Sequence, residues 1–190
     1  MKSLLLPALF LAAFSTCAAP SRDSFNIASV EAPGRLERVT LNDAHIELSL
    51  PQAWQSKPEF HERTGSMMFL FHRKAVYDSQ GRRVVPSLGV LVEDVPDGVD
   101  LVEYSTAKRT QASQRDMSSI KLAWASAEGP GSLCYVAEYL DPGGISHKAY
   151  LFHTLSTGKG VQIIIDGTES VFNMLDPEYR LIIGRLRYID

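Results

Sequence analysis

Short β-favouring runs recur through the sequence from residue 39 to residue 165, and no other feature constrains the fold as strongly. The runs cover 39–41, 46–50, 67–71, 84–92, 120–125, 133–140, 148–155 and 161–165, and turn-forming residues separate most of them. Strands joined by tight turns pair in antiparallel fashion, whereas a parallel sheet requires a crossover helix after each strand. The sequence therefore predicts an α+β fold built on a central antiparallel β-sheet, and it disfavours a Rossmann-like fold.

The first hairpin is predicted from an alternation of apolar and polar residues around a tight turn. Apolar residues alternate with polar ones over 39–41 and again over 46–50, and Asn42-Asp43 supplies the turn. Pro51 ends the second strand, and Trp54 follows on a short turn from which we expect it to fold back onto the core.

A second, longer hairpin is predicted from the runs 67–71 and 84–92, with turn residues at 78–81 between them. Its tip is basic, because four cationic residues lie there: Arg73, Lys74, Arg82 and Arg83. Such a group of charges is either simply solvated or the contact surface for an acidic partner.

The later strands are separated by glycine-containing turns at 141–144 and 158–160. The run 133–140 contains Cys134, which we interpret as a buried small apolar residue. The run 161–165 is almost entirely apolar, which is typical of a strand covered on both faces.

Two to three helices are expected to flank this sheet. Asp100 is a candidate N-cap with Glu103 as its capping-box partner, and the helix runs to about Met117. Its apolar face is thin and consists of Leu101, Tyr104, Ala107 and Ala112. Near the C-terminus, 170–175 and 178–184 read as two helical segments around Asp176-Pro177, and a last strand follows at 186–189.

The N-terminus has the layout of a secretory signal peptide. Lys2 precedes an apolar run of 11 residues, Leu4 to Phe14, which is too short to span a bilayer and is followed by small residues. We expect residues 1–19 to be the signal peptide, 20–34 a linker or flexible arm, and 35–190 a single α+β domain. The protein is then periplasmic or secreted.

Cys17 leaves two forms of export open. Cleavage after Ala18 or Ala19 removes Cys17, and Cys134 then has no partner for an intrachain disulfide. Lipidation of Cys17 would instead tether the chain to a membrane as a lipoprotein, although Phe14-Ser15-Thr16 is a poor match to the residues that usually precede a lipidated cysteine.

Four segments carry a resemblance to a known family. The strand ending Leu50-Pro51-Gln52-Ala53-Trp54, the helix from Asp100, the strand 160–165 and the closing segment 172–186 resemble the PsbP-like superfamily. This superfamily takes in the extrinsic PsbP protein of photosystem II, a nuclear-transport factor that binds Ran, and bacterial periplasmic proteins. The resemblance implies a central antiparallel sheet flanked by helices and a role in binding or assembly. It implies no catalytic residue.

The sequence contains no motif for a cofactor, a metal or a nucleophile. The histidines lack the spacing of a metal pair; they are His45, His61, His72, His147 and His153. Neither a Gly-x-Ser-x-Gly elbow nor a phosphate-binding glycine loop is present, and the acids at 93–103 lack the alternation of a calcium loop. A net charge of -3 gives no electrostatic reason to bind nucleic acid.

We therefore expect an exported, non-catalytic binding or assembly domain of the bacterial cell envelope, with an envelope protein as its partner. One alternative is a carrier or sensor of a small apolar or amphipathic ligand, held by aromatic residues between sheet and helix: Phe69, Tyr135, Tyr139, Tyr150 and Phe152. A second alternative is an enzyme whose site is assembled from residues far apart in the sequence. The identity of the partner and the oligomeric state do not follow from the sequence.

Overall fold

A computed structural model describes residues 35–63, 65–113, 117, 119–126 and 131–189, so the predicted signal peptide, the flexible arm and Cys17 lie outside the described residues. The first half of the chain contains β1 (Leu36–Leu41), η1 (Asn42–Ala44), β2 (Ile46–Pro51), β3 (Glu59–Arg63), β4 (Ser66–His72), β5 (Val76–Tyr77), β6 (Arg83–Val84) and β7 (Ser87–Asp94). The second half contains α1 (Leu101–Ser113), β8 (Ser119–Ser126), β9 (Ser132–Leu140), β10 (Ser146–Ser156), β11 (Lys159–Thr168), α2 (Glu169–Gly184) and β12 (Arg187–Tyr188).

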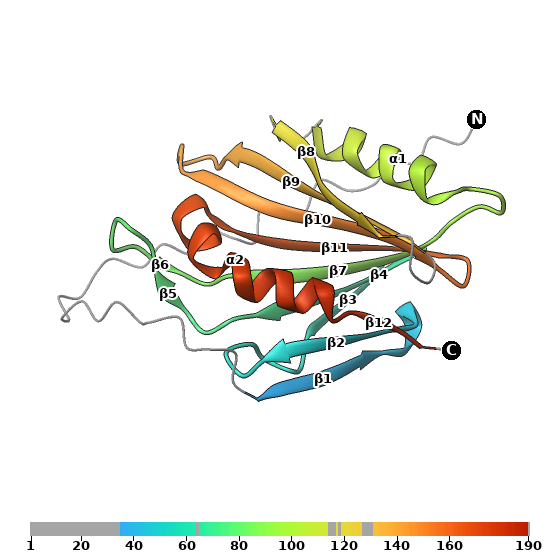
Figure 1. Cartoon of the computed structure of the whole chain (residues 1–190), viewed down its shortest axis with the longest axis horizontal. Coiled ribbons are helices and arrows are strands. Elements are labelled where there is room, and N and C mark those ends of the chain that lie inside the picture. The colour runs from blue at the N-terminus through green and yellow to red at the C-terminus, as the bar shows by residue number, and fades with distance from the viewer. Residues whose placement is uncertain (1–34, 64, 114–116, 118, 127–130, 190) are drawn as a thin grey trace.

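The centre of the fold is a seven-stranded antiparallel sheet with the strand order β3-β4-β7-β11-β10-β9-β8 (Figure 1). After β7 the chain passes through α1 to β8 at the far edge and returns through β9 and β10, so that β11 pairs with β7. A three-stranded sheet, β1-β2-β12, and a two-stranded sheet, β5-β6, complete the structure. The predicted α+β fold with a central antiparallel sheet is confirmed.

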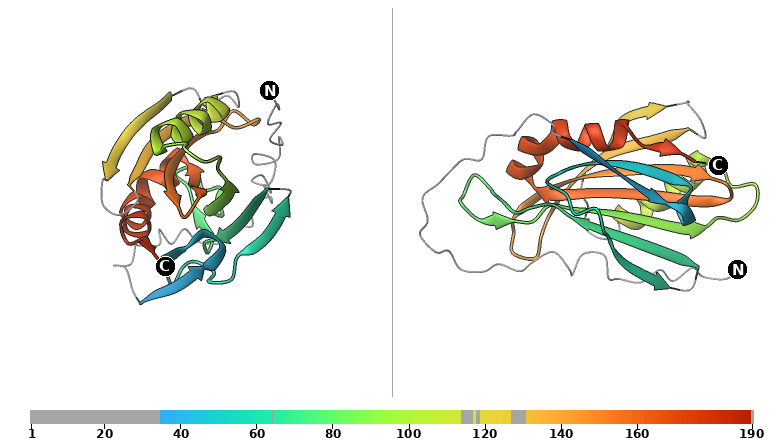
Figure 2. Two further views of the ribbon diagram at one scale, coloured as in Figure 1. Left: turned by 90° about the vertical axis from the view of Figure 1, so that its right-hand side faces the viewer. Right: turned by 90° about the horizontal axis from the view of Figure 1, so that it is seen from below.

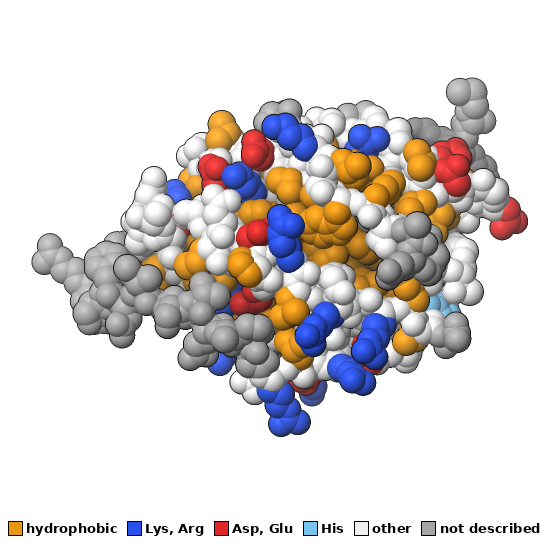
Figure 3. Space-filling model, in the orientation of Figure 1, with side chains coloured by type: hydrophobic (Ala, Val, Ile, Leu, Met, Phe, Trp, Pro, Cys, Tyr) orange, Lys and Arg blue, Asp and Glu red, His pale blue; other side chains and the backbone are white. Residues whose placement is uncertain are grey.

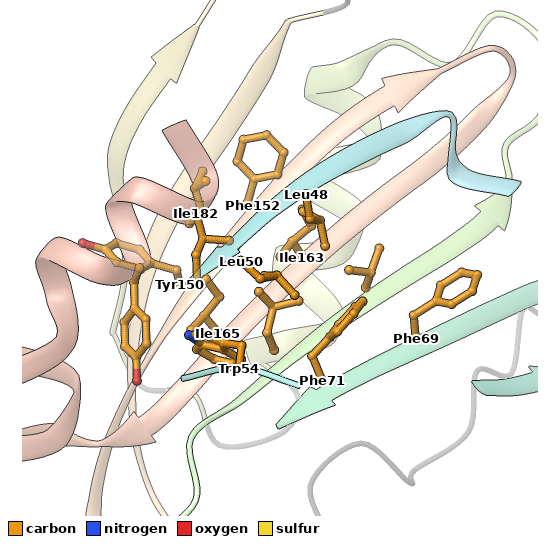
Figure 4. Packing of buried hydrophobic residues seen from close by; sticks show 14 of the residues in the cluster. Leu48, Leu50, Trp54, Phe69, Phe71, Tyr150, Phe152, Ile163, Ile165 and Ile182 are labelled. Carbon is orange, nitrogen blue, oxygen red and sulfur yellow. The ribbon is translucent and has the colours of Figure 1, made fainter. Parts of the chain in front are cut away.

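The main core lies between α2, β2 and one face of the seven-stranded sheet. Because side chains alternate along a strand, residues two apart on β10 and β11, such as Tyr150 and Phe152 or Ile163 and Ile165, point to this face. Leu48 and Leu50 of β2 approach the same layer (Figure 4), where Ile182 of α2 also lies. Burying a side chain of this size contributes roughly 2 kcal/mol.

The opposite face of the sheet carries α1 and a smaller apolar cluster. The cluster consists of Ala112, Tyr135, Ala137, Ala149 and Leu151. Figure 2 shows the two helices on opposite sides of the sheet, as the alternation along β10 requires. The predicted apolar face of α1 is corrected in part: Ala107 is exposed, while the polar residues Ser105 and Lys108 are buried together with Tyr104 and Ala112.

Both predicted hairpins are present. β1 pairs with β2 up to Leu41 opposite Ile46, and the turn is a 3-10 helix that ends at His45 in the left-handed conformation with φ 51°. β4 pairs with β7, and the small β5-β6 sheet extends this second hairpin beyond the edge of the main sheet. Trp54 is buried, as expected, and bridges to Arg73.

Two sequence-based expectations about the elements were wrong. The C-terminal region forms one helix, α2, with Pro177 inside it, instead of two segments. A proline inside a helix costs about 3 kcal/mol, but the apolar stripe of Val171, Phe172, Leu175, Tyr179 and Ile182 continues across it and buries several large side chains at roughly 2 kcal/mol each. The strand β3 was missed, because Phe60 is its one apolar residue and the other four are charged or polar, so the strand shows no alternation of apolar and polar residues.

Among the described residues, neither helix is long and apolar enough to cross a lipid bilayer.

Candidate functional site

The hairpin arm, residues 74–85, projects from the strands β4 and β7, and Arg73 anchors its base to α2. The Arg73 guanidinium binds the Glu178 carboxylate through two hydrogen bonds, Nε to Oε1 at 2.9 Å and Nη2 to Oε2 at 3.2 Å. Trp54 Nε1 donates to the same Oε1 at 2.6 Å. The Arg73 and Glu178 side chains are only 13% and 11% exposed, so this ion pair is largely removed from water.

Asp78 shapes the tip of the hairpin arm. Its Oδ1 accepts hydrogen bonds from the backbone N–H groups of Gln80 and Arg82 at 2.9 and 2.8 Å, and its Oδ2 accepts from Arg82 Nε at 2.6 Å. Gly81 adopts φ 74°, a conformation that favours glycine. Arg82 therefore forms an ion pair with Asp78 inside the arm, just as Arg73 forms one with Glu178 at its base.

The other two predicted cations, Lys74 and Arg83, are exposed. Arg83 lies directly opposite Tyr77 in the β5-β6 pair, so the two side chains share a face, and Tyr77 is 61% exposed. Within the described part of the chain neither Lys74 nor Arg83 forms an ion pair. The structure thus separates the four predicted contact residues into Arg73 and Arg82, which hold the arm, and Lys74 and Arg83, which face solvent; of these two, Arg83 lies beside an exposed tyrosine.

A buried polar cluster joins α1 to the sheet, and it contains the only close contact of a serine hydroxyl with a histidine ring among the described hydrogen bonds. Ser105 Oγ lies 2.9 Å from Nδ1 of His153 and 3.1 Å from the hydroxyl of Tyr135. Nε2 of His153 lies 3.0 Å from Nε2 of Gln162. Burial, assisted by the positive charges of Lys108 and Arg109, lowers the pKa of His153 to about 3, so the ring is neutral at pH 7.

A serine beside a histidine is the arrangement of an activated nucleophile, but such a site must also admit a substrate. Ser105 and His153 both have 0% exposed surface, since Ser105 faces the sheet from α1 and His153 lies beneath that helix. An ion pair between Lys108 of α1 and Glu93 of β7 also joins the helix to the sheet. The arrangement therefore serves to dock α1. Sequence reasoning missed this contact, because the spacing of 48 residues between Ser105 and His153 matches no motif.

A second polar cluster surrounds His147, nearer the other end of the same sheet face. Its Nδ1 lies 3.3 Å from Oδ2 of Asp166, and its Nε2 lies 3.8 Å from Oδ2 of Asp141. Tyr139 donates its hydroxyl to Asp166 at 2.8 Å, and burial followed by the Asp166 charge raises the pKa of Tyr139. No group of three or more His, Cys, Asp or Glu side chains in the described ranges is arranged to hold a metal ion.

The aromatic residues expected to line a ligand pocket do not lie together. Tyr135 and Tyr139 point to the α1 side of the sheet, whereas Tyr150, Phe152 and Phe69 belong to the α2 core, and all five are buried. Cys134 is also buried in that core, and burial raises the pKa of its thiol. A buried thiol of raised pKa is unreactive.

No protein-family model and no curated protein matches this sequence. Several solved structures are similar in fold. The Ran-binding protein Mog1p of Saccharomyces cerevisiae aligns with a TM-score of 0.53 and 11% identity over 82% of this chain and 96% of its own. PA94 of Pseudomonas aeruginosa, a protein of unknown function, aligns with a TM-score of 0.51 and 13% identity over 83% of this chain and 99% of its own.

The cyanobacterial PsbP protein of Synechocystis sp. PCC 6803 is also found, with a TM-score of 0.48 and 15% identity over 89% of this chain and 98% of its own. Because the PsbP-like superfamily takes in a Ran-binding nuclear-transport factor, the likeness to Mog1p confirms the PsbP-like fold predicted from the sequence. At such low identity the likeness concerns the fold and not the activity.

Proposed function

We propose that this PsbP-like chain is an exported, non-catalytic binding domain, which uses its hairpin arm to hold an acidic protein partner in the bacterial cell envelope. The observation that carries the proposal is Tyr77, which is 61% exposed beside the unpaired cation Arg83 on an arm anchored at its base and tip. Tyrosine and arginine are the residues that most often dominate the energy of protein interfaces.

The anchoring of the arm supports a role in binding. Arg73, Glu178 and Trp54 hold its base, and Asp78 holds its tip, so the exposed face is ordered before any partner arrives. A preordered surface loses less conformational entropy on association, which leaves more of the contact energy for affinity. The exposed charges Lys74 and Arg83 favour a partner of negative charge.

Capture of a partner from an envelope extract with crosslinking tests this proposal. We expect saturable capture by the wild-type protein and at least a tenfold loss for the double variant Tyr77→Ala, Arg83→Glu. Val102→Ala is the matched control, because Val102 is 64% exposed and lies on α1, on the face of the sheet opposite α2, which anchors the arm. Equal capture by the wild type and the double variant would show that the arm is not the contact surface.

Export is part of the same proposal and has its own measurement. Mass spectrometry of the mature N-terminus should show a chain that begins directly after Ala18 or Ala19. A lipid-modified Cys17 at the N-terminus would replace the soluble form with a membrane-anchored one. A mature protein that still begins at Met1 would contradict export by a cleaved signal.

A further inference from the structure

A shallow cavity of about 400 Å³ lies over the outer face of the three-stranded sheet, where the C-terminal segment leaves α2. We call it the arginine groove. Its lining includes Leu36, Arg38, Ser49, Arg185, Leu186 and Arg187. In Figure 3 several Lys and Arg side chains gather over this part of the molecule, below α2. In Figure 1, β12 and the C-terminus lie towards the end of the molecule opposite β5 and β6 of the hairpin arm.

The register of the strands brings the arginines together. Arg38 of β1 lies opposite Ser49, and Arg187 of β12 lies opposite Glu47. Since Glu47 and Ser49 are two residues apart on β2, both arginines are on the same face of this sheet, the face turned away from Leu48 and the core. Arg185 joins them directly after the end of α2.

The positive charge in the groove is not balanced within the described residues. Glu47 is the one carboxylate that approaches, and its Oε1 lies 3.8 Å from Nε of Arg38, a long distance for an ion pair. Arg185 and Arg187 are exposed and form no side-chain hydrogen bond or ion pair with any residue that the structure describes. Three guanidinium groups thus face one carboxylate, on a chain whose formal net charge is -3.

The other features of the groove also suit an anion. Ser49 lies on the central strand β2 between the arginines, is 8% exposed and is one of the residues that line the groove. The C-terminal end of α2 contributes about half a negative charge, but backbone bonds such as Arg185 N–H to the carbonyl of Leu181 at 3.1 Å already engage its last carbonyls. Three full positive charges outweigh this partial one.

We propose that the arginine groove binds a small polyanion through its phosphate or carboxylate groups. Guanidinium groups match the geometry of both oxyanions through paired hydrogen bonds. The volume lies within the range of small-molecule sites and is too small for a folded partner to enter. The groove and the hairpin arm are formed by different residues. The anion-binding proposal can therefore be tested independently of the proposed function.

Isothermal titration calorimetry at low ionic strength tests the site, with pyrophosphate and citrate as two probes. We expect saturable binding of at least one probe by the wild-type protein. Pyrophosphate as the tighter ligand would assign phosphate chemistry, and citrate would assign carboxylate chemistry. Arg187→Gln and Arg38→Gln should each weaken binding about tenfold, because each removes a charge-assisted contact.

The matched control is Arg83→Gln, which removes the same charge from the hairpin arm and should leave the affinity unchanged. Ser49→Leu, checked for folding by circular dichroism, should abolish binding by filling the groove without changing the charge of the protein. The proposal is overturned if neither probe binds, or if Arg83→Gln weakens binding as much as Arg187→Gln. Loss of partner capture in the arm variants would leave this result untouched.

Discussion

His153 is a residue whose protonation state is decided by its burial. Its ring is fully enclosed between Ser105 and Gln162, and its pKa falls from 6.5 to about 3. Below pH 6.5 the unfolded chain therefore binds a proton that the folded chain does not, so this residue makes the protein less stable as the pH falls towards 3.

We expect the wild-type protein to lose stability between pH 6.5 and pH 4 faster than His153→Asn, by a difference of roughly 1 kcal/mol per pH unit. Urea unfolding of both proteins at several pH values measures this difference. Carboxylates shared by the two proteins titrate in the same range, but their contribution cancels in the comparison. Parallel curves for the two proteins would mean that His153 is protonated in the folded state.

Arg73 forms a largely buried ion pair with Glu178, which its place in a cluster of cations did not predict. Removing it leaves the Glu178 carboxylate largely buried with Trp54 as its remaining hydrogen-bond partner. We expect Arg73→Ala to lower the free energy of unfolding by about 2 kcal/mol. Lys74→Ala, the exposed neighbour, should change it by less than about 0.5 kcal/mol. Equal, small effects in denaturant titrations would show that the ion pair adds nothing to stability.

At the scale of elements, α1 and α2 are held by different means. α2 packs a broad apolar stripe into the main core, whereas α1 buries one tyrosine, one alanine and the polar residues Ser105 and Lys108. The docking of α1 depends on a close approach to β11 at Gly160. A Cβ atom there would lie 2.6 Å from Cζ of Tyr104 and 2.7 Å from Cγ2 of Val95.

Gly160→Ala should therefore displace Tyr104 and lower the free energy of unfolding by about 1–3 kcal/mol. Gly184→Ala is the control, because nothing lies within 4 Å of its added Cβ atom and alanine suits a helix better than glycine, so no loss is expected. Native-state hydrogen exchange should show the change first in α1. A Gly160→Ala protein with unchanged stability and unchanged exchange in α1 would contradict this account of the docking.

At the scale of the whole molecule, the structure separates two exposed features from two buried polar clusters. The hairpin arm and the arginine groove draw on different elements, β5-β6 for the arm and β1, β2 and β12 for the groove, and Figure 1 shows β5-β6 and β12 towards opposite ends. The histidines of the α1 side, His147 and His153, are both held in hydrogen bonds beneath the surface. The binding surfaces and the buried polar clusters therefore do not overlap.

The sequence by itself determined most of the secondary structure, because hydrophobic alternation and turn chemistry are local properties. The two hairpins, the Asp100 cap of α1 and the antiparallel sheet all follow from residues close together in the chain, and Glu103 N–H does donate to Asp100 at 2.8 Å. The continuous helix across Pro177 did not follow, since its stability comes from packing on distant strands.

The candidate sites could be predicted only in outline. Sequence proximity placed the four cations of the hairpin arm near one another, but only the tertiary structure decided that Arg73 pairs with Glu178, 105 residues away, and that Arg83 stays free beside Tyr77. The same holds for Arg38 and Arg187, which strand pairing brings to one face of β2. Local patterns encode which elements form, whereas charge pairing and burial depend on contacts between residues that only folding makes neighbours.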